Sequence, residues 1–96
     1  MLTSKSRAFL RSLSMNADTV FQIGKGGISN EICRQIANCL EARELAKIKV
    51  LKNSGYTAKE VANEIAEKIL AEVICCLGNK FVLYKKSEKN SRIELP

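Results

Sequence analysis

Two kinds of hydrophobic spacing alternate along this chain, and this alternation limits the possible folds more than any other feature. From residue 28 to residue 40, aliphatic side chains recur at every fourth position, which predicts an amphipathic helix over residues 28–43. Residues 45–51 then alternate apolar and basic side chains, with the period of two that is typical of a half-buried strand. Ser29 stands where an N-cap of the helix is expected.

Two further helices follow from similar patterns. Residues 3–14 have helical spacing, and three of their apolar side chains are expected on one buried face: Phe9, Leu10 and Leu13. Thr57 and Glu60 form a capping box, in which each side chain is expected to satisfy a backbone N–H near the other. The helix that it opens is expected to turn four aliphatic side chains inward: Val61, Ile65, Ile69 and Leu70.

Short β-branched and aromatic runs predict the remaining strands. Residues 20–23 form one run, and residues 73–77 and 81–85 form two more around a tight turn at Gly78-Asn79. The expected order is therefore α-β-α-β-α-β-β in a single domain of 96 residues. This order predicts an α/β fold in the loose sense, an α+β sandwich in which helices pack on a mixed four-stranded sheet.

The last ten residues form a polar tail over residues 87–96. Ile93 and Leu95 interrupt its polar character, and we expect them to dock it on the domain. The longest apolar run, residues 73–77, is far too short to span a membrane, so no membrane association is predicted. Basic residues interrupt the N-terminal apolar stretch, which argues against a secretory signal and predicts a cytoplasmic protein.

Composition excludes most catalytic chemistry. The chain has no histidine and one aspartate, Asp18, which removes histidine-dependent triads and the common zinc-enzyme sites. We therefore expect no enzyme activity, no metal and no cofactor.

The four cysteines contain no C-x-x-C pair and are expected to be reduced, small core residues: Cys33, Cys39, Cys75 and Cys76. The adjacent pair Cys75-Cys76 is assigned no function.

The charge balance favours a polyanionic partner. Sixteen Lys and Arg against ten Asp and Glu give a net charge of +6. Basic residues concentrate in the first helix, the glycine segment, the strand at residues 45–51 and the last hairpin, whereas the helix after Thr57 is acidic. The alternative is that these runs are only solvated faces.

A glycine segment, Gly24-Lys25-Gly26-Gly27, lies between a predicted strand and the longest helix. It lacks the spacing and the Lys-Ser/Thr pair of a P-loop. As a dinucleotide fingerprint it would end at Ser29 in place of glycine, and its acidic partner would stand at the wrong end of the next strand. The spacing does match the G-x-x-G that holds nucleic-acid backbone in KH domains, although a plain tight turn is the commoner origin of such a segment.

Together with the N-terminal helix, four stretches give the chain a family resemblance: residues 20–29, 42–50, 77–85 and 92–96. In order and spacing they resemble the CRM domain, in particular the stand-alone bacterial YhbY-type proteins. The resemblance implies a fold similar to the C-terminal domain of bacterial translation initiation factor three. It also implies RNA binding through the G-x-x-G loop with Lys47 and Lys49, with precursor large-subunit ribosomal RNA as the partner.

We therefore expect a non-catalytic, monomeric RNA-binding protein that acts in assembly of the large ribosomal subunit. The loop residues Gly24, Lys25, Gly26 and Gly27 would admit a phosphate, with N–H groups from a helix beginning near residue 28. Further phosphates would meet seven cations: Lys5, Arg7, Arg11, Lys47, Lys80, Lys85 and Lys86.

Two further expectations concern rings and partners. Tyr56 lies in a turn and is expected to be the exposed ring, whereas Phe21 and Tyr84 lie in strand patterns and are expected in the core. The alternative function is a basic adaptor that docks on a ribosomal protein or an RNA-processing factor.

Overall fold

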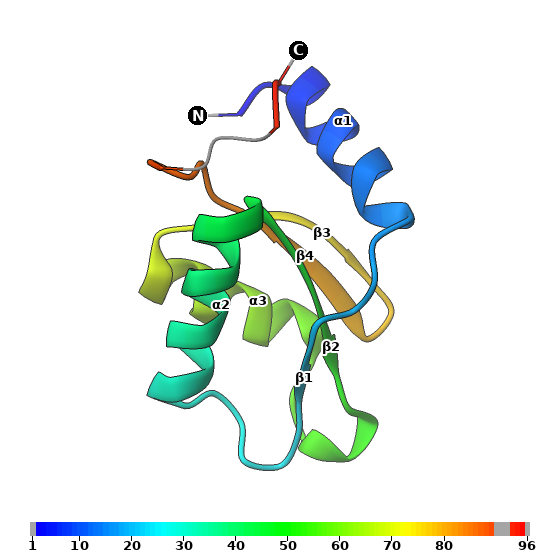
Figure 1. Ribbon diagram of the computed structural model, residues 1–96. Helices are drawn as coiled ribbons and strands as arrows, with labels where there is room; N and C mark the ends of the chain where they lie inside the picture. Colours follow the sequence, from blue (N-terminus) through cyan, green and yellow to red (C-terminus); the bar gives the residue numbers. More distant parts are fainter. Residues whose placement is uncertain (1, 90–92, 96) are drawn as a thin grey trace.

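The computed structural model describes residues 2–89 and 93–95. In chain order its elements are α1 (Ser4–Met15), β1 (Phe21–Ile23), α2 (Asn30–Arg43), β2 (Leu45–Val50), the 3-10 helix η1 (Lys52–Ser54), α3 (Ala58–Ile69), β3 (Glu72–Leu77) and β4 (Lys80–Tyr84) (Figure 1). The predicted α-β-α-β-α-β-β order is confirmed. The turn expected after β2 contains one turn of 3-10 helix.

The four strands form one mixed sheet in the order β1-β2-β4-β3. β1 runs parallel to β2, whereas β4 is antiparallel to both of its neighbours. The β3–β4 hairpin therefore places β4 between β2 and β3, and β3 becomes an edge strand. Helices α2 and α3 provide the long crossovers that return the chain to parallel strands.

The main core lies between the sheet and the pair α2 and α3. Alternate residues of β2 point into it, as predicted, so that Ala46, Ile48 and Val50 are buried. Ile36 and Leu40 of α2 are fully buried against this face of the sheet. The remaining α3 and sheet residues of this cluster are aliphatic or aromatic: Val61, Ala62, Ile65, Phe81 and Leu83 among them.

Helix α1 covers the opposite face of the sheet, so the molecule has three layers (Figure 1). Leu10 is fully buried there, against Ile74, Val82 and Tyr84. The prediction that Phe9 and Leu13 share this buried face is wrong, because they remain 38% and 41% exposed.

The buried line of α1 is instead Ser6, Leu10 and Ser14, at successive i+4 positions. Two small serines on either side of a leucine allow the helix to lie close to the sheet along one narrow line. Neighbouring positions on the helix, Phe9 and Leu13 among them, therefore stay at its edges.

The N-caps of α2 and α3 are the residues predicted from the sequence, but the end of α3 differs from the prediction. The Ser29 hydroxyl caps α2 by accepting a bond from the Ile32 N–H, and the Thr57 hydroxyl caps α3 by accepting one from the Glu60 N–H. The Glu60 carboxylate accepts a bond from the Thr57 hydroxyl at 2.9 Å, where a bond from a backbone N–H was expected. Leu70 was expected inward but is 80% exposed, because it ends α3 in the left-handed conformation, with φ at 59°.

The cysteines are all free, but they do not all lie in the core. Cys33 is buried and Cys39 packs against the core. Cys76 is exposed, contrary to expectation, since β3 is an edge strand and successive side chains point to opposite faces. Desolvation raises the pKa of the Cys76 thiol, and neighbouring Cys75 raises it further, so the thiol form is favoured.

The chain after β4 is held by the last turn of α2. The buried Glu44 carboxylate accepts bonds from the Ser87 N–H at 2.9 Å and the Ile93 N–H at 2.8 Å. Glu41 accepts bonds from the Ser87 hydroxyl at 3.0 Å and the Lys89 N–H at 3.1 Å. Ile93 and Leu95 pack beside the α1 cluster. Residues 90–92 and 96 of the predicted tail lie outside the described residues.

Candidate nucleic-acid interface

The glycine segment forms a tight turn that projects beyond the sheet between β1 and α2 (Figure 1). The Gly27 N–H donates to the Gly24 carbonyl at 2.9 Å and closes the turn. Lys25 and Gly26 form its exposed tip. A ligand can therefore approach the backbone here without meeting a side chain at position 26.

Gly27 is the position at which the turn requires glycine. Its φ is +66°, and a Cβ there would lie 2.9 Å from the hydroxyl oxygen of Tyr56. Tyr56 is 46% exposed, which confirms the prediction of an exposed ring, and Gly55 alone separates it from η1. The loop thus has an aromatic ring at its base, from a segment about thirty residues further along the chain.

Backbone hydrogen bonds gather three loops at the same end of the sheet. The Leu51 N–H donates to the Ile23 carbonyl at 2.8 Å, which joins the end of β2 to the start of the glycine loop. The Val50 N–H donates to the Asn79 carbonyl at 2.7 Å, which joins β2 to the β3–β4 turn. These bonds define the loop end of the sheet, which consists of the glycine loop, η1 and the β3–β4 turn.

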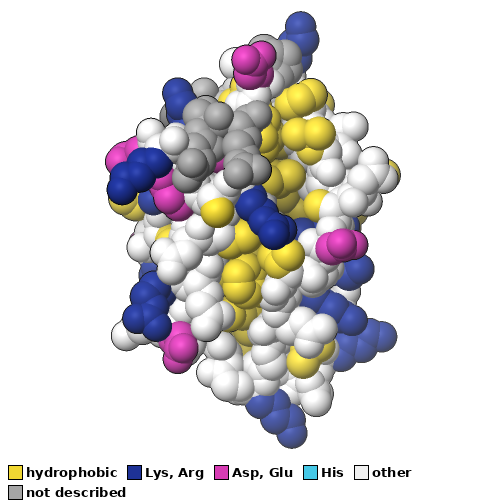
Figure 2. All heavy atoms as spheres, in the orientation of Figure 1, with side chains coloured by type: hydrophobic (Ala, Val, Ile, Leu, Met, Phe, Trp, Pro, Cys, Tyr) yellow, Lys and Arg dark blue, Asp and Glu magenta, His cyan; other side chains and the backbone are white. Residues whose placement is uncertain are grey.

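Lysines concentrate near the loop end, on the face of the sheet against which α1 packs. Lys49 of β2 stands directly opposite Lys80 of β4, and Lys47 lies two residues before Lys49 on the same face. Two like charges placed opposite each other across strands destabilise a sheet. The pair makes this face of the sheet a site of concentrated positive charge. Figure 2 shows Lys and Arg side chains gathered along the lower right edge and at the bottom of the molecule.

The family model of the CRS1 / YhbY (CRM) domain matches residues 2–85. The chain belongs to this family. "Probable RNA-binding protein YqeI" of Bacillus subtilis is 43% identical over 96 residues, which is 100% of both chains. An "RNA-binding protein" of Haemophilus influenzae is 30% identical over 95 residues, 99% of this chain and 95% of the relative.

A solved structure has the same fold. The solution structure of SAV1595 from Staphylococcus aureus, described as "a putative RNA binding protein", superposes with a TM-score of 0.82. It is 45% identical in sequence, and the match covers 100% of both chains. The α+β fold predicted from the sequence is thus shared with an experimental structure of a similar protein.

In this CRM domain the cations named from the sequence fall into two groups. Lys25, Lys47 and Lys80 lie at or near the loop end, with Arg11 nearby on α1. Lys85 and Lys86 follow the far end of β4, and Lys80 and Lys85 are about 17 Å apart at the rise of an extended strand. Lys5 lies on the first turn of α1. One compact ligand therefore does not contact all of them.

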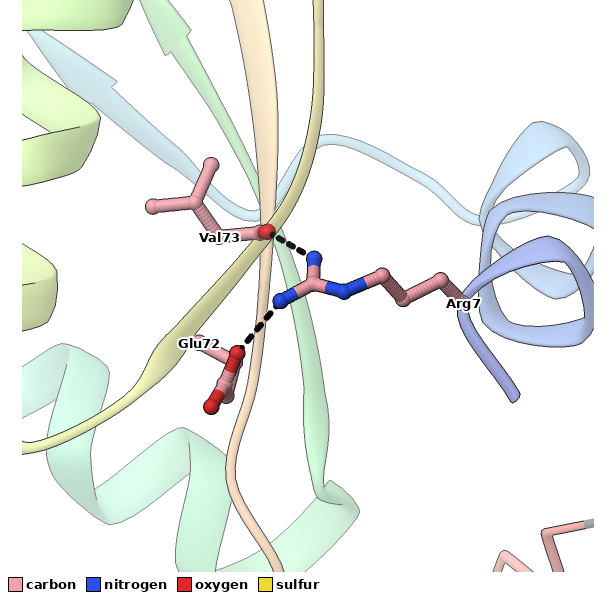
Figure 3. A network of polar contacts seen from close by, with 3 residues as sticks. All are labelled: Arg7, Glu72 and Val73. Carbon is pink, nitrogen blue, oxygen red and sulfur yellow. Dashed lines mark hydrogen bonds and ion pairs between the residues drawn. The ribbon is translucent and has the colours of Figure 1, made fainter. Parts of the chain in front are cut away.

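Three of these cations make contacts within the CRM domain. The Lys47 Nζ donates to the Ser14 carbonyl near the end of α1, at 3.2 Å. The Arg7 guanidinium donates to the Glu72 carboxylate at 2.6 Å and to the Val73 carbonyl at 2.8 Å (Figure 3). The Lys85 Nζ donates to the Ile69 carbonyl at the end of α3, at 3.0 Å. Arg7 thus ties α1 to the edge strand, and Lys85 ties β4 to α3.

The N-terminus of α2 offers less to an anion than expected. The helix begins at Asn30, directly after the predicted N-cap Ser29, so Ile28 and Ser29 separate it from the glycine turn. The Ser29 hydroxyl already accepts the Ile32 N–H, and Glu31 brings a negative charge into the first turn. The loop backbone and the lysines therefore contribute more of the positive potential than this helix end does.

The loop has an acidic side and a basic side. Towards α3, a cleft of about 230 Å³ beside Gly26 and Tyr56 is lined by the carboxylates of Glu60 and Glu64. Towards the sheet lie Lys49 and Lys80. A polyanion is therefore expected to leave the loop across the sheet and away from α3.

Sequence reasoning missed one cation of this end. Lys52 is the first residue of η1 and is exposed at the loop end. Its place directly after the basic strand β2 was the available signal. Among the described residues, no group of three His, Cys, Asp or Glu side chains is placed to hold a metal ion, and no helix is long and apolar enough to cross a membrane.

Proposed function

We propose that this CRM domain binds RNA without catalysing a reaction, and that the RNA backbone crosses the loop end of the sheet. The observation that carries the proposal is the pair Lys49 and Lys80, placed opposite each other beside an exposed G-x-x-G turn. Two relatives that match over 100% and 95% of their length are named as RNA-binding proteins, which supports the same function here.

Each part of the loop end has a distinct role in the proposed interface. The turn at Lys25 and Gly26 admits a phosphate close to the backbone, and the Lys25 ammonium supplies charge. Lys49 and Lys80 neutralise the phosphates that follow, with Lys47 next along the strand. Phosphate contacts carry no base information, so this surface prefers RNA shape and unpaired segments over a fixed sequence.

The partner proposed here is precursor large-subunit ribosomal RNA, so that the protein acts as a cytoplasmic assembly factor. The resemblance to stand-alone YhbY-type proteins supports this choice. Sedimentation of a cell lysate through a sucrose gradient tests it. We expect the protein to co-migrate with large-subunit precursors at low salt and to be released at high salt, because phosphate contacts weaken with salt. Confinement to the top fractions at low salt would remove the ribosomal part of the proposal.

A nuclease step separates RNA binding from protein docking. The protein is recovered with its bound partners before and after digestion of RNA. An RNA-binding factor loses its partners on digestion. Partners that remain bound after digestion would indicate an adaptor that docks on protein.

A further inference from the structure

An apolar groove lies beside the basic face of the sheet, between the C-terminal half of α1 and the β3–β4 hairpin. Its volume is about 340 Å³, within the range of about 300–1,000 Å³ typical of small-molecule sites. Met15 of α1 and Leu77 of β3 stand at its two sides, 72% and 67% exposed, and Cys75 and Val82 lie between them. Large apolar side chains exposed around a groove offer an apolar contact surface to a ligand.

All the charged residues at the rim of this groove are basic. The charged residues that line it are three cations from three elements: Arg11, Lys47 and Lys80. None of the lining residues is Asp or Glu. The cleft on the α3 side of the loop differs in this respect, because Glu60 and Glu64 line it.

Lys80 belongs both to this rim and to the cross-strand pair with Lys49. The sheet places Gln22, Lys49, Lys80 and Leu77 in one row across its four strands, which spans about 14 Å at the usual strand spacing. A strand of RNA that crosses the lysines from the glycine loop therefore reaches the groove directly.

We propose that the groove holds one unpaired, unstacked nucleobase of the bound RNA. This assignment rests on the proposed RNA-binding function and names a subsite within it. A flat, uncharged ring with a phosphate on either side matches an apolar floor with a cationic rim. The Met15 thioether and the Leu77 side chain pack on the ring, and the thioether is well suited to contact with aromatic rings. Arg11 and Lys80 neutralise the flanking phosphates, and Lys47, whose Nζ donates to the Ser14 carbonyl, adds positive charge beside them.

The test compares two identical substitutions at exposed leucines. Leu77→Gln removes the apolar wall of the groove without changing charge. Leu70→Gln is the matched control, because Leu70 is 80% exposed and lies past the end of α3, outside the groove. Affinity is measured for an oligouridine of about 12 nucleotides and for an abasic ribose-phosphate strand of the same length.

We expect Leu77→Gln to weaken oligouridine binding about five- to tenfold, the scale of one lost base contact. Binding of the abasic strand and the slope of affinity against salt should stay unchanged, because no cation is removed. Leu70→Gln should match the wild type. Photocrosslinking of 4-thiouridine in the oligonucleotide should label peptides containing Met15 or Leu77.

The outcomes separate this inference from the proposed function. If the wild type binds ribosomal RNA but Leu77→Gln and Leu70→Gln bind oligouridine equally, the groove assignment is overturned and RNA binding stands. The same conclusion follows if the wild type prefers the abasic strand, or if the groove captures a protein segment in place of RNA. If the wild type binds neither ribosomal RNA nor oligouridine, both proposals fail.

Discussion

Gly27 is the residue on which the shape of the glycine loop depends most. Its φ of +66° lies in the left-handed region, which costs a residue with a side chain about 1–2 kcal/mol. A Cβ would also press on the Tyr56 hydroxyl at 2.9 Å. Gly26, in contrast, has open space around its Cα and no positive φ. The two glycines therefore serve different purposes: Gly27 forms the turn and Gly26 keeps it open.

We predict that Gly27→Ala lowers the free energy of unfolding by about 1–2 kcal/mol, because it adds a side chain in a left-handed conformation. Gly26→Ala should change it by less than about 0.5 kcal/mol, as for an exposed position. Urea denaturation of the two variants, followed by circular dichroism, measures the difference. Equal stabilities would show that Gly27 is not constrained as described.

For single residues, the sequence predicts the glycine loop but not the residues that lie against it. Glycine spacing and a neighbouring lysine are local signals, so Gly24 to Gly27 can be identified directly. The contact between Gly27 and Tyr56 joins positions far apart in the chain and depends on how η1 returns towards α2. The exposure of Leu70 likewise depends on one left-handed residue at a helix end, which no periodic pattern records.

Helix α1 is held on the sheet by a buried leucine, by Arg7, and by the Lys47 Nζ of β2, which donates to the Ser14 carbonyl. Leu10 is fully buried, and the Arg7 guanidinium joins the helix to Glu72 and Val73 of β3 (Figure 3). The hydrophobic pattern predicts this helix and its length almost to the residue. It does not predict the buried face, because serines at positions 6 and 14 allow closer contact than the larger Phe9 and Leu13.

We predict that Arg7→Met lowers the free energy of unfolding by about 1 kcal/mol, because it leaves the Val73 carbonyl and Glu72 without their charged partner. The side chains of this pair are about two-fifths exposed, which limits the effect. Lys5→Met on the same helix is the control and should have little effect. Loss of RNA affinity and of salt dependence in Arg7→Met, with stability unchanged, would instead make Arg7 a phosphate contact.

The last turn of α2 holds the C-terminal segment through a titratable group. The Ser87 hydroxyl and the Lys89 N–H both donate to the Glu41 carboxylate and hold its pKa below the usual range. A carboxyl whose folded pKa is lowered stabilises the docked state above its unfolded pKa. That stabilisation is lost as pH falls through the folded pKa.

We predict that acidification from neutral pH to about 3 weakens docking of residues 87–89, and that Glu41→Gln removes the part of this dependence due to Glu41. The amide resonances of Ser87 and Lys89 in NMR spectra report the docking. Glu31→Gln, at an exposed carboxylate on the first turn of the same helix, is the matched control. A pH dependence that is unchanged in Glu41→Gln would assign the effect to another titratable group.

The molecule as a whole separates its charges by end and by face. The loop end has Lys25, Lys49, Lys52 and Lys80, whereas the outer side of α3 has glutamates. The net charge of +6 predicts a polyanionic partner. It does not predict where that partner lies, because the register of β2 against β4 decides that Lys49 faces Lys80, and register is a property of the folded sheet.

We predict that the double variant Lys49→Gln, Lys80→Gln weakens RNA binding and reduces the log–log salt slope by about 1.4, or about 0.7 for each lost phosphate contact. Lys85→Gln, Lys86→Gln removes the same charge from the far end of β4 and is the matched control, which should leave the slope nearly unchanged. Filter binding over a range of salt concentrations measures both. Equal effects of the two pairs would mean that net charge alone drives binding.

The most direct measurement is the affinity of the double variant Lys25→Glu, Gly26→Asp for an in vitro transcript of large-subunit ribosomal RNA. Gly26 has no atom within 4 Å of an added Cβ and no positive φ, and Lys25 is exposed, so both changes fit the native turn. We predict that binding is abolished, because two carboxylates then stand where phosphate approaches, while the melting temperature stays close to that of the wild type. Unchanged affinity in this folded variant would contradict the placement of RNA at the glycine loop.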